Sequence, residues 1–145
     1  MNTATPVAAL SPAPINTRFI ANGDGTVTQP AAGLMWSQAT LTPDCIAHQA
    51  AEKVCADLAL AGFTDWRLPT IEELFALADR TRSSPAIDTD AFHDTQSDWY
   101  WSSTITAWSS NYAWIVNFNN GNAGSLHRVY GGGLVRAVRS VAPGQ

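Results

Sequence analysis

Three short apolar runs near the start of the chain predict strands. They cover residues 19–20, 26–28 and 33–37, and the Asn-Gly-Asp-Gly sequence at residues 22–25 predicts a tight turn after the first run. The Asp-Gly pair in this turn also occurs in calcium-binding loops, but the regular series of acidic residues that such loops use is missing. We therefore expect a turn and no calcium site.

Two amphipathic segments follow and predict helices. In the first, residues 42–44 (Thr-Pro-Asp) are typical of a capped helix start, and Gly62 is typical of a helix end. Between these limits, apolar residues recur with the helical period at Ala47, Ala50, Ala51, Val54, Leu58 and Ala61. In the second, Thr70 and Glu73 have the spacing of a capping box. We expect this helix to end near residue 78 and to bury Ile71, Leu74, Phe75 and Leu77.

The last third of the chain is rich in predicted strands. Residues 80–98 are polar and lack a clear period, so we expect a long ordered loop there. Strands are then predicted at residues 99–104, 112–118 and 125–130, and the Asn-Gly pair at residues 120–121 is a strong hairpin signal. Glycines 131–133 interrupt the pattern before a last apolar segment at residues 134–138. Helices and strands are segregated along the chain, which predicts an α+β fold.

Alternation within the 112–118 strand suggests which side chains it buries. Trp114, Val116 and Phe118 share one face, which we expect to be buried, and Ile115 and Asn117 share the other, which we expect to face solvent. In the last segment, the odd spacing of Arg136 and Arg139 places them on opposite faces. Four tryptophans, Trp36, Trp66, Trp101 and Trp114, are expected in the core.

The composition excludes several classes of function. Charged residues make up 14% of the chain, below the usual ~25%, so Ser, Thr, Asn and Gly must cover much of the surface. The net charge is −4, and Lys53 is the single lysine beside seven arginines. A sequence-independent nucleic-acid binder needs a basic face, and a polybasic membrane patch is also absent. We expect one domain at residues 17–141 that binds no nucleic acid and does not insert into a membrane.

Residues 1–16 predict a flexible N-terminal arm. They are dominated by Ala, Pro, Thr and Ser, and they lack the basic and apolar regions of a signal peptide. No stretch approaches the ~20 apolar residues of a membrane helix. The location stays open between the cytoplasm and a phage particle or cell surface reached by a route without such a signal.

The ionisable residues do not form a recognisable catalytic pattern. His48, His93 and His127 fall in a helix, a loop and the last β-rich segment, without a Ser-His-Asp or Cys-His order. Cys45 and Cys55 are ten residues apart with no further Cys or His at ligand spacing, so they are either two buried thiols or one optional disulfide. We expect no enzymatic activity, no metal site and no cofactor.

The Asp65-Trp66-Arg67 sequence has both a functional and a structural interpretation. A catalytic or calcium-binding role is one, and a buried turn that pins the two helices to a sheet is the other. The structural interpretation is favoured because an acid and a base flank a large aromatic residue just before Pro69. We expect Arg67 to pair with a carboxylate or with backbone carbonyls.

Four motifs occur together in an order and spacing that resembles the DUF1566 family, also called the Legionella collagen-like protein C-terminal domain family. They lie at residues 33–36, 65–74, 100–104 and 135–139, so the resemblance covers about residues 18–141. It implies a C-type-lectin-like fold, related to that of the formylglycine-generating enzyme, with two helices packed on short antiparallel sheets. Known members are mostly binding or adhesion modules. Some are variable proteins of diversity-generating retroelements, which display a randomised C-terminal segment on a fixed fold.

Two family-related activities are not supported by the residues present. The formylglycine-generating chemistry uses a cysteine pair near the C-terminal substrate site, and this chain has no cysteine after Cys55. The Glu-Pro-Asn and Trp-Asn-Asp motifs that bind sugars through calcium in lectins are also absent.

Residues 104–134 have a composition that fits a variable segment. Five asparagines fall close together, at Asn111, Asn117, Asn119, Asn120 and Asn122, and Asn is what an unmutated adenine-rich template codon encodes. Mutation at the first two bases of such codons cannot produce Lys, Glu, Gln, Met or Trp. The segment contains no Lys, Glu, Gln or Met, whereas the other 114 residues contain eleven. Trp108 and Trp114 would then be fixed by the template.

This segment is our predicted binding surface for a protein or cell-surface ligand. Its aromatic and small polar residues resemble those of an antibody paratope, in which rigid rings supply contact area and small polar groups supply hydrogen bonds. The predicted solvent-facing residues are Ile105, Thr106, Trp108, Ser109, Tyr112, Ile115, Asn117, Asn119, Asn120, Asn122, Ser125, Leu126, His127, Val129 and Tyr130.

Three hypotheses about function follow. The first is a diversified, non-enzymatic binding protein. The second is a non-diversified adhesin or phage tail-tip domain with a fixed protein or polysaccharide ligand. The third, least favoured, is a formylglycine-generating-like enzyme. The sequence makes no prediction about the oligomeric state.

Overall fold

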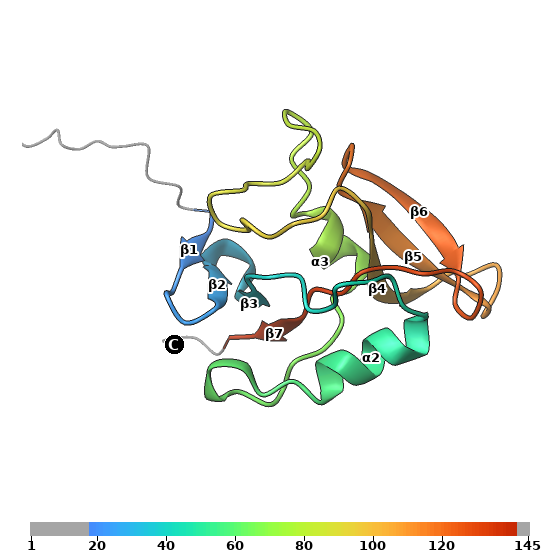
Figure 1. Ribbon diagram of the computed structural model, residues 1–145, viewed down its shortest axis with the longest axis horizontal. Coiled ribbons are helices and arrows are strands. Elements are labelled where there is room, and N and C mark those ends of the chain that lie inside the picture. Colours follow the sequence, from blue (N-terminus) through green and yellow to red (C-terminus); the bar gives the residue numbers. More distant parts are fainter. Residues whose placement is uncertain (1–17, 142–145) are drawn as a thin grey trace, which may run out of the picture.

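In the computed structural model, which describes residues 18–141, the chain forms two small antiparallel sheets and two short α-helices (Figure 1). The first sheet has the order β1-β2-β3-β7, from Ile20–Ala21, Thr26–Gln29, Leu34–Ser37 and Val138–Ser140. The second has the order β4-β5-β6, from Trp99–Ile105, Tyr112–Asn117 and Asn122–His127. The helices are α2, His48–Ala56, and α3, Ile71–Phe75, with 3-10 turns at Pro30–Ala32 and Leu60–Gly62. The predicted α+β class is confirmed, and the predicted arm at residues 1–16 lies outside the described residues.

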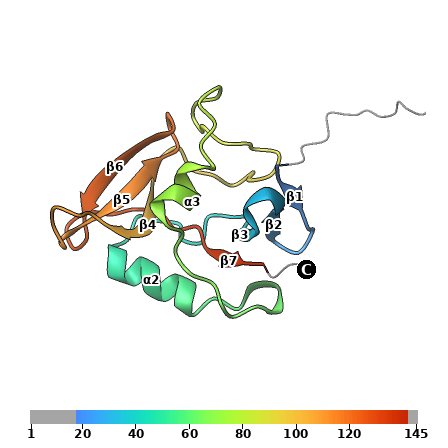
Figure 2. The same ribbon diagram turned by 180° about the vertical axis from the view of Figure 1, so that it is seen from behind.

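The two sheets lie at opposite ends of the molecule, and α3 lies between them (Figures 1 and 2). After β6, the chain runs back from the second sheet to the first, where β7 pairs with β3. Isolated bridges from Leu134 to Tyr100 and from Val138 to Arg67 hold this returning segment in place. Both ends of the described chain therefore lie beside the first sheet, far from the loop at residues 106–111 and the turn at 128–130 (Figures 1 and 2).

Both faces of the second sheet are buried over part of their length, and this corrects one prediction. On one face, Tyr100 and Val116 belong to a core cluster with Leu74 of α3. On the other face, Ile115 joins Trp101 in a second cluster that α2 and the returning segment cover. Ile115 is fully buried, so its predicted exposure is wrong. The alternation rule predicts one buried face and one exposed face, whereas here α3 covers one face of the sheet and α2 with the returning segment covers the other.

The tryptophan predictions are largely confirmed. Trp36, Trp66 and Trp101 are buried, as expected. Trp114 is half-buried, because its ring lies where the cover over the first face ends. The predicted core position of Trp114 is therefore only partly right.

Helix α2 is shorter at both ends than the sequence predicts. It begins at His48 with Ala47 as its N-cap and ends at Ala56, so residues 42–44 do not start it and Gly62 does not end it. The cause is a tertiary bridge: the backbone of Ile46 donates to the Gly133 carbonyl at 2.9 Å and accepts from the Gly133 N–H at 3.0 Å. This pairing holds the preceding segment extended. Of the apolar positions that follow the helical period, Ala50 and Ala61 are exposed.

Helix α3 shows the predicted capping box. The Thr70 side chain accepts from the Glu73 N–H at 3.2 Å, and the Glu73 carboxylate accepts from the Thr70 N–H at 2.9 Å. The helix ends at Phe75, earlier than expected, and Phe75 is 37% exposed, so its predicted burial is wrong. Leu74 and Leu77 are fully buried, as predicted.

The structural interpretation of the Asp65-Trp66-Arg67 sequence is confirmed. Trp66 is buried, and Arg67 donates to both carboxylate oxygens of Glu73, at 2.7 and 2.9 Å. Asp65 accepts from Arg139 at 2.6 and 3.2 Å, and this contact lowers the pKa of the Asp65 carboxyl. Arg136 instead donates to groups near the end of β3, so the two arginines do lie on opposite faces.

The two cysteines are both free, and only one of them fits the prediction. Cys55 is buried, and burial raises the pKa of its thiol to about 12. Cys45 is exposed, so the expectation of two buried thiols is wrong for this residue. Partial burial of its thiol and the neighbouring Asp98 carboxylate raise the pKa of Cys45 as well.

The predicted long loop and the predicted hairpin are both present, and backbone hydrogen bonds connect them. Residues 80–98 contain no described helix or strand, and the N–H groups of Ser84 and Ala86 donate to the carbonyls of Asn119 and Phe118. The β5–β6 hairpin has a four-residue loop at 118–121, in which Gly121 adopts a φ of 82°. The third strand starts earlier than predicted, at Asn122, and ends at His127.

Gly133 is expected to tolerate no side chain. A Cβ at this position would lie 3.0 Å from the Trp101 ring, whereas a Cβ at Gly124 would meet only ordinary contacts at 3.4 Å or more. We expect Gly133→Ala to lower the free energy of unfolding by about 1–3 kcal/mol through overpacking, and Gly124→Ala to change it by less than about 0.5 kcal/mol. Urea unfolding measures both. Equal stability of the two variants would mean that the Trp101 ring has room to move.

Candidate functional site

One face of the second sheet is covered at one end and open at the other. Tyr112, Trp114 and Val116 share this face because side chains alternate along β5. Their partners on β6 are His127, Ser125 and Ala123, in that order. Helix α3 and its neighbours bury Val116 completely, whereas Tyr112 and Trp114 are half-buried and all three β6 partners stay at least partly exposed. The open end is therefore the Tyr112–His127 end.

Four rings form a continuous strip across this open end. Trp108 lies 4.6 Å from Tyr112, Tyr112 lies 5.2 Å from His127, and His127 lies 4.6 Å from Tyr130, measured between ring centroids. These distances are those of favourable aromatic pairs. Trp108 is 63% exposed and Tyr130 is 87% exposed. We call Trp108, Tyr112, His127 and Tyr130 the aromatic strip.

The loop that carries Trp108 is held from within by Thr106. The Thr106 N–H donates to the Tyr112 carbonyl at 3.0 Å, and its hydroxyl donates to the Ser109 carbonyl at 2.7 Å. Thr106 is 4% exposed, so its predicted place on the solvent-facing surface is wrong. It supports the loop instead of contacting a ligand.

The turn that carries Tyr130 is organised by the His127 side chain. Its Nδ1 accepts from the N–H groups of Val129 at 3.1 Å and Tyr130 at 3.2 Å. The Gly131 N–H donates to the His127 carbonyl at 2.8 Å, and a Cβ at Gly131 would come within 2.6 Å of that same oxygen. The ring of His127 is thereby fixed between Tyr112 and Tyr130.

Arg128 and His48 brace the two loops against α2. Arg128 Nε donates to His48 Nδ1 at 3.1 Å, and its guanidinium also donates to the Ser110 carbonyl at 3.2 Å. Since Nδ1 of His48 is the acceptor, Nε2 carries the ring proton and donates to the Ser102 carbonyl at 2.8 Å. His48 is fully buried, and this burial lowers the pKa of its imidazole. The aromatic strip therefore stands on a braced framework.

The buried neutral His48 predicts a specific loss of stability in mild acid. His48 has an ordinary pKa of about 6.5 in the unfolded chain and a lower pKa in the folded protein. As the pH drops from 7.5 to 5.5, His48 is therefore protonated more readily in the unfolded chain, and the free energy of unfolding falls. One such proton contributes at most about 1.4 kcal/mol per pH unit. We expect His48→Gln to flatten this slope and His93→Gln, on an exposed loop residue, to leave it unchanged. Urea unfolding across this pH range measures the slopes, and equal slopes in both variants would contradict the assignment.

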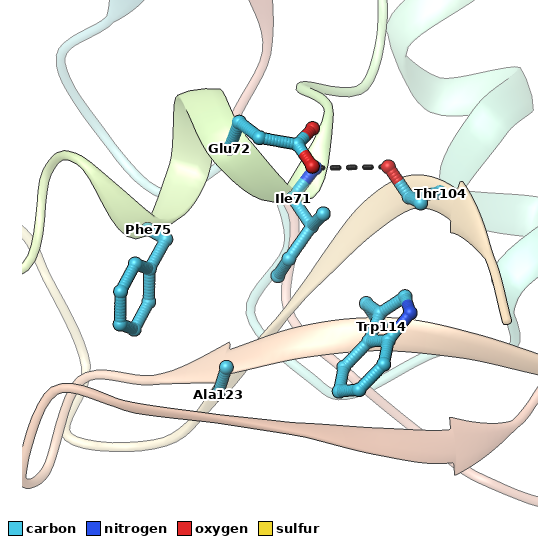
Figure 3. Close-up of a pocket in the computed structure, with 6 residues that line it drawn as sticks. All are labelled: Ile71, Glu72, Phe75, Thr104, Trp114 and Ala123. Carbon is cyan, nitrogen blue, oxygen red and sulfur yellow. Dashed lines mark hydrogen bonds between the residues drawn. The ribbon is translucent and has the colours of Figure 1, made fainter.

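A pocket of about 360 Å³ adjoins the strip (Figure 3). Its wall is α3 and its floor is the second sheet, and we call it the α3 pocket. Its lining residues are Ile71, Glu72, Phe75, Thr104, Trp114 and Ala123. The Ile71 N–H donates to the Thr104 hydroxyl oxygen at 2.9 Å, which closes the side where helix and sheet meet.

Sequence reasoning missed this pocket. It placed Ile71, Phe75 and Trp114 in the core. One signal was available, because Tyr112 and Trp114 are two residues apart on one strand and must share a face. Tyr112 was assigned to the surface and Trp114 to the core, and the pocket lies where that face changes from open to covered.

The predicted asparagines at the hairpin do not join the aromatic strip. Asn117 and Tyr112 are at opposite ends of β5, about 17 Å apart along the strand. Asn117 and Asn120 accept hydrogen bonds from the backbone of Asn119 and Asn122, at 2.9 and 3.1 Å. These side chains shape the turn.

The remaining predicted residues vary in exposure. Val129 is 68% exposed and Ile105 is 37% exposed, so both can contact a ligand. Ser109, Ser125 and Leu126 are half-buried, and Leu126 packs against the second core cluster. The structure thus divides the predicted surface into the strip with its neighbours, the hairpin turn, and the buried Thr106 and Ile115.

In the part of the chain that the structure describes, no group of three or more His, Cys, Asp or Glu residues is placed to hold a metal ion. No helix among residues 18–141 has the length and apolar character needed to cross a bilayer.

No curated protein matches the sequence. The Lcl C-terminal domain family matches residues 25–139, which contain all four motifs and most of the described chain. The chain therefore belongs to the Lcl C-terminal domain family.

Proposed function

We propose that the chain is a non-enzymatic recognition domain that binds a protein or cell-surface ligand through the aromatic strip. The observation that carries this proposal is the run of adjoining rings, with Trp108 and Tyr130 largely exposed on a braced framework. Contiguous apolar patches on a protein surface commonly mark binding sites. Rigid aromatic residues also dominate binding energy at interfaces, because they bury much area at low entropy cost.

In this proposal the scaffold is C-type-lectin-like, as the family resemblance implies. Two helices, two small antiparallel sheets and a long ordered loop support that assignment. The arrangement also suits recognition, since the loop at residues 106–111 and the turn at 128–130 lie at the end of the molecule opposite both ends of the described chain (Figure 1).

We further propose that the surface is diversified by a retroelement. Support comes from the composition of residues 104–134 and from the exposure of Asn119, Asn120 and Tyr130. The buried Thr106 and Ile115 would be held constant. The test is the gene's neighbourhood: a reverse transcriptase gene and a near-repeat of this coding segment, differing only at adenines, are expected. Their absence would favour the alternative, an adhesin or tail-tip domain with one fixed ligand at the same surface.

A binding panel tests the recognition function. Purified cell-surface proteins and polysaccharides are screened with the wild-type domain, Tyr130→Ala, and Ile20→Ala as a matched control. Ile20 is 49% exposed on β1, in the other sheet. We expect a ligand that binds wild type and Ile20→Ala, binds Tyr130→Ala more weakly, and is recovered chemically unchanged. We expect no binding to duplex DNA or anionic vesicles. A ligand whose affinity is unaffected by Tyr130→Ala, or one that is turned over, would overturn the proposal.

A further inference from the structure

We infer that the α3 pocket receives a lysine side chain of a protein partner. The inference depends on the proposed function for the existence of a partner, and it adds the chemical group that the partner must present. It rests on three features of the pocket: its apolar walls, the exposed Glu72 carboxylate on its rim and its aromatic faces.

The walls fit the apolar stem of a lysine. Ile71 and Phe75 extend from α3 toward the sheet, and Trp114 and Ala123 lie beneath them on β5 and β6 (Figure 3). The volume of about 360 Å³ is at the lower end of the range for ligand pockets, which suits one long side chain. A lysine buries its four-carbon stem readily while its charged end stays near solvent.

The rim supplies a carboxylate for the ammonium group. Glu72 lines the pocket and is exposed, and none of the ion pairs among residues 18–141 involves it. Its neighbour Glu73 is already engaged by Arg67 at 2.7 Å. Glu72 is therefore the acid available to an incoming cation.

The aromatic faces favour a cation as well. One face of the Phe75 ring is already occupied by a cation of the protein, because the Arg80 guanidinium carbon lies 4.3 Å from the ring centroid. Trp114, on the pocket floor, belongs to the side-chain type that attracts cations most strongly through its ring. A carboxylate and aromatic rings around an apolar hollow together discriminate against neutral and anionic groups.

The pocket and the aromatic strip lie close enough to serve one partner. Trp114 is two residues from Tyr112 on β5, a spacing of roughly 7 Å along the strand, and Ser125 separates Ala123 from His127 on β6. A partner whose lysine enters the α3 pocket can therefore also contact the strip.

Titration with small probes tests the pocket apart from any partner. The indole N–H resonance of Trp114, assigned through Trp114→Phe, is followed by NMR during addition of n-butylammonium chloride, 1-butanol or sodium butyrate. We expect butylammonium to bind at least threefold more tightly than 1-butanol and butyrate to bind most weakly. We expect Glu72→Gln to remove the preference for butylammonium, and Glu52→Gln, at an exposed glutamate on α2, to retain it. Equal binding of butylammonium and 1-butanol to wild type, or an unchanged preference in Glu72→Gln, would overturn the inference.

The same variants separate this inference from the proposed function. Trp108→Ala is expected to weaken the panel ligand and to leave the butylammonium titration unchanged, because Trp108 does not line the pocket. Acetylation of the lysines of a protein ligand is expected to weaken its binding to wild type and to have no further effect on Glu72→Gln. If acetylation has the same effect on both, the lysine assignment is wrong even where the strip still binds.

Discussion

Replacing Arg136 with methionine is expected to lower the free energy of unfolding by more than about 3 kcal/mol. The side chain is fully buried and donates to the Ser37 carbonyl at 2.8 Å, to the Gln38 carbonyl and to the Thr95 hydroxyl at 2.9 Å. Its guanidinium carbon also lies 4.9 Å from the Phe92 ring centroid. Methionine fills much of the volume but supplies no donor to these three acceptors.

This outcome differs from what is common for buried ion pairs. Replacing both partners of such a pair with apolar residues is often neutral or stabilising, because two desolvated charges disappear together. Here the main acceptors of Arg136 are backbone carbonyls, which no substitution removes. Burial lowers the pKa of the Arg136 guanidinium because desolvation disfavours its charged form. The hydrogen bonds to the carbonyls offset this cost of desolvation.

Urea unfolding of Arg136→Met against Arg82→Met measures the effect. Arg82 is a matched control because its side chain is 42% exposed and pairs with Asp79 at the surface. We expect Arg82→Met to change stability by less than about 0.5 kcal/mol. Similar stability in the two variants would mean that the groups around Arg136 rearrange to satisfy one another.

Replacing Trp108 with alanine is expected to weaken the panel ligand by at least about 30-fold, or about 2 kcal/mol. Trp108 lies at one end of the aromatic strip, and its ring packs in a tilted arrangement against Tyr112, with 4.6 Å between the centroids. Because it is 63% exposed, its removal should leave the melting temperature nearly unchanged.

Two further variants check that the ring itself is responsible. Trp108→Phe should restore part of the affinity, since it keeps an aromatic face over Tyr112. Trp99→Ala removes another exposed tryptophan, 39% exposed and outside the strip, and should leave the affinity unchanged. Titration calorimetry measures all three variants. If Trp108→Ala lost affinity only to the extent that the folded fraction of the protein decreased, Trp108 would belong to the scaffold and not to the binding surface.

Local signals in the sequence predicted which helices and strands form better than they predicted the residues at which these begin and end. The Thr70–Glu73 capping box lies where its spacing places it, and the Asn-Gly pair at 120–121 lies in a hairpin. The start of α2 was predicted wrongly, because the backbone of Ile46 pairs with Gly133, 87 positions further along the chain. No local pattern contains that contact.

The candidate site could be predicted only in part, for the same reason. Trp108 and Tyr130 were placed on the surface because they lie in the segment that the family resemblance implies is variable, and both are exposed. Ile115 was misplaced because its cover comes from α2 and from the segment after β6, which lie far from β5 in sequence. The α3 pocket was missed because Glu72, on its wall, comes from a helix some forty residues before its floor, Trp114.

The most direct test of the proposed binding surface is an NMR footprint of the ligand that the panel selects. Titration into the isotopically labelled wild-type domain should shift the resonances of Trp108, Tyr112, His127 and Tyr130, which form the strip, and of Trp114 beside them. It should leave the first sheet, β1-β2-β3-β7, unchanged. Shifts confined to the first sheet, with the strip unaffected, would contradict the assignment of the aromatic strip as the binding surface.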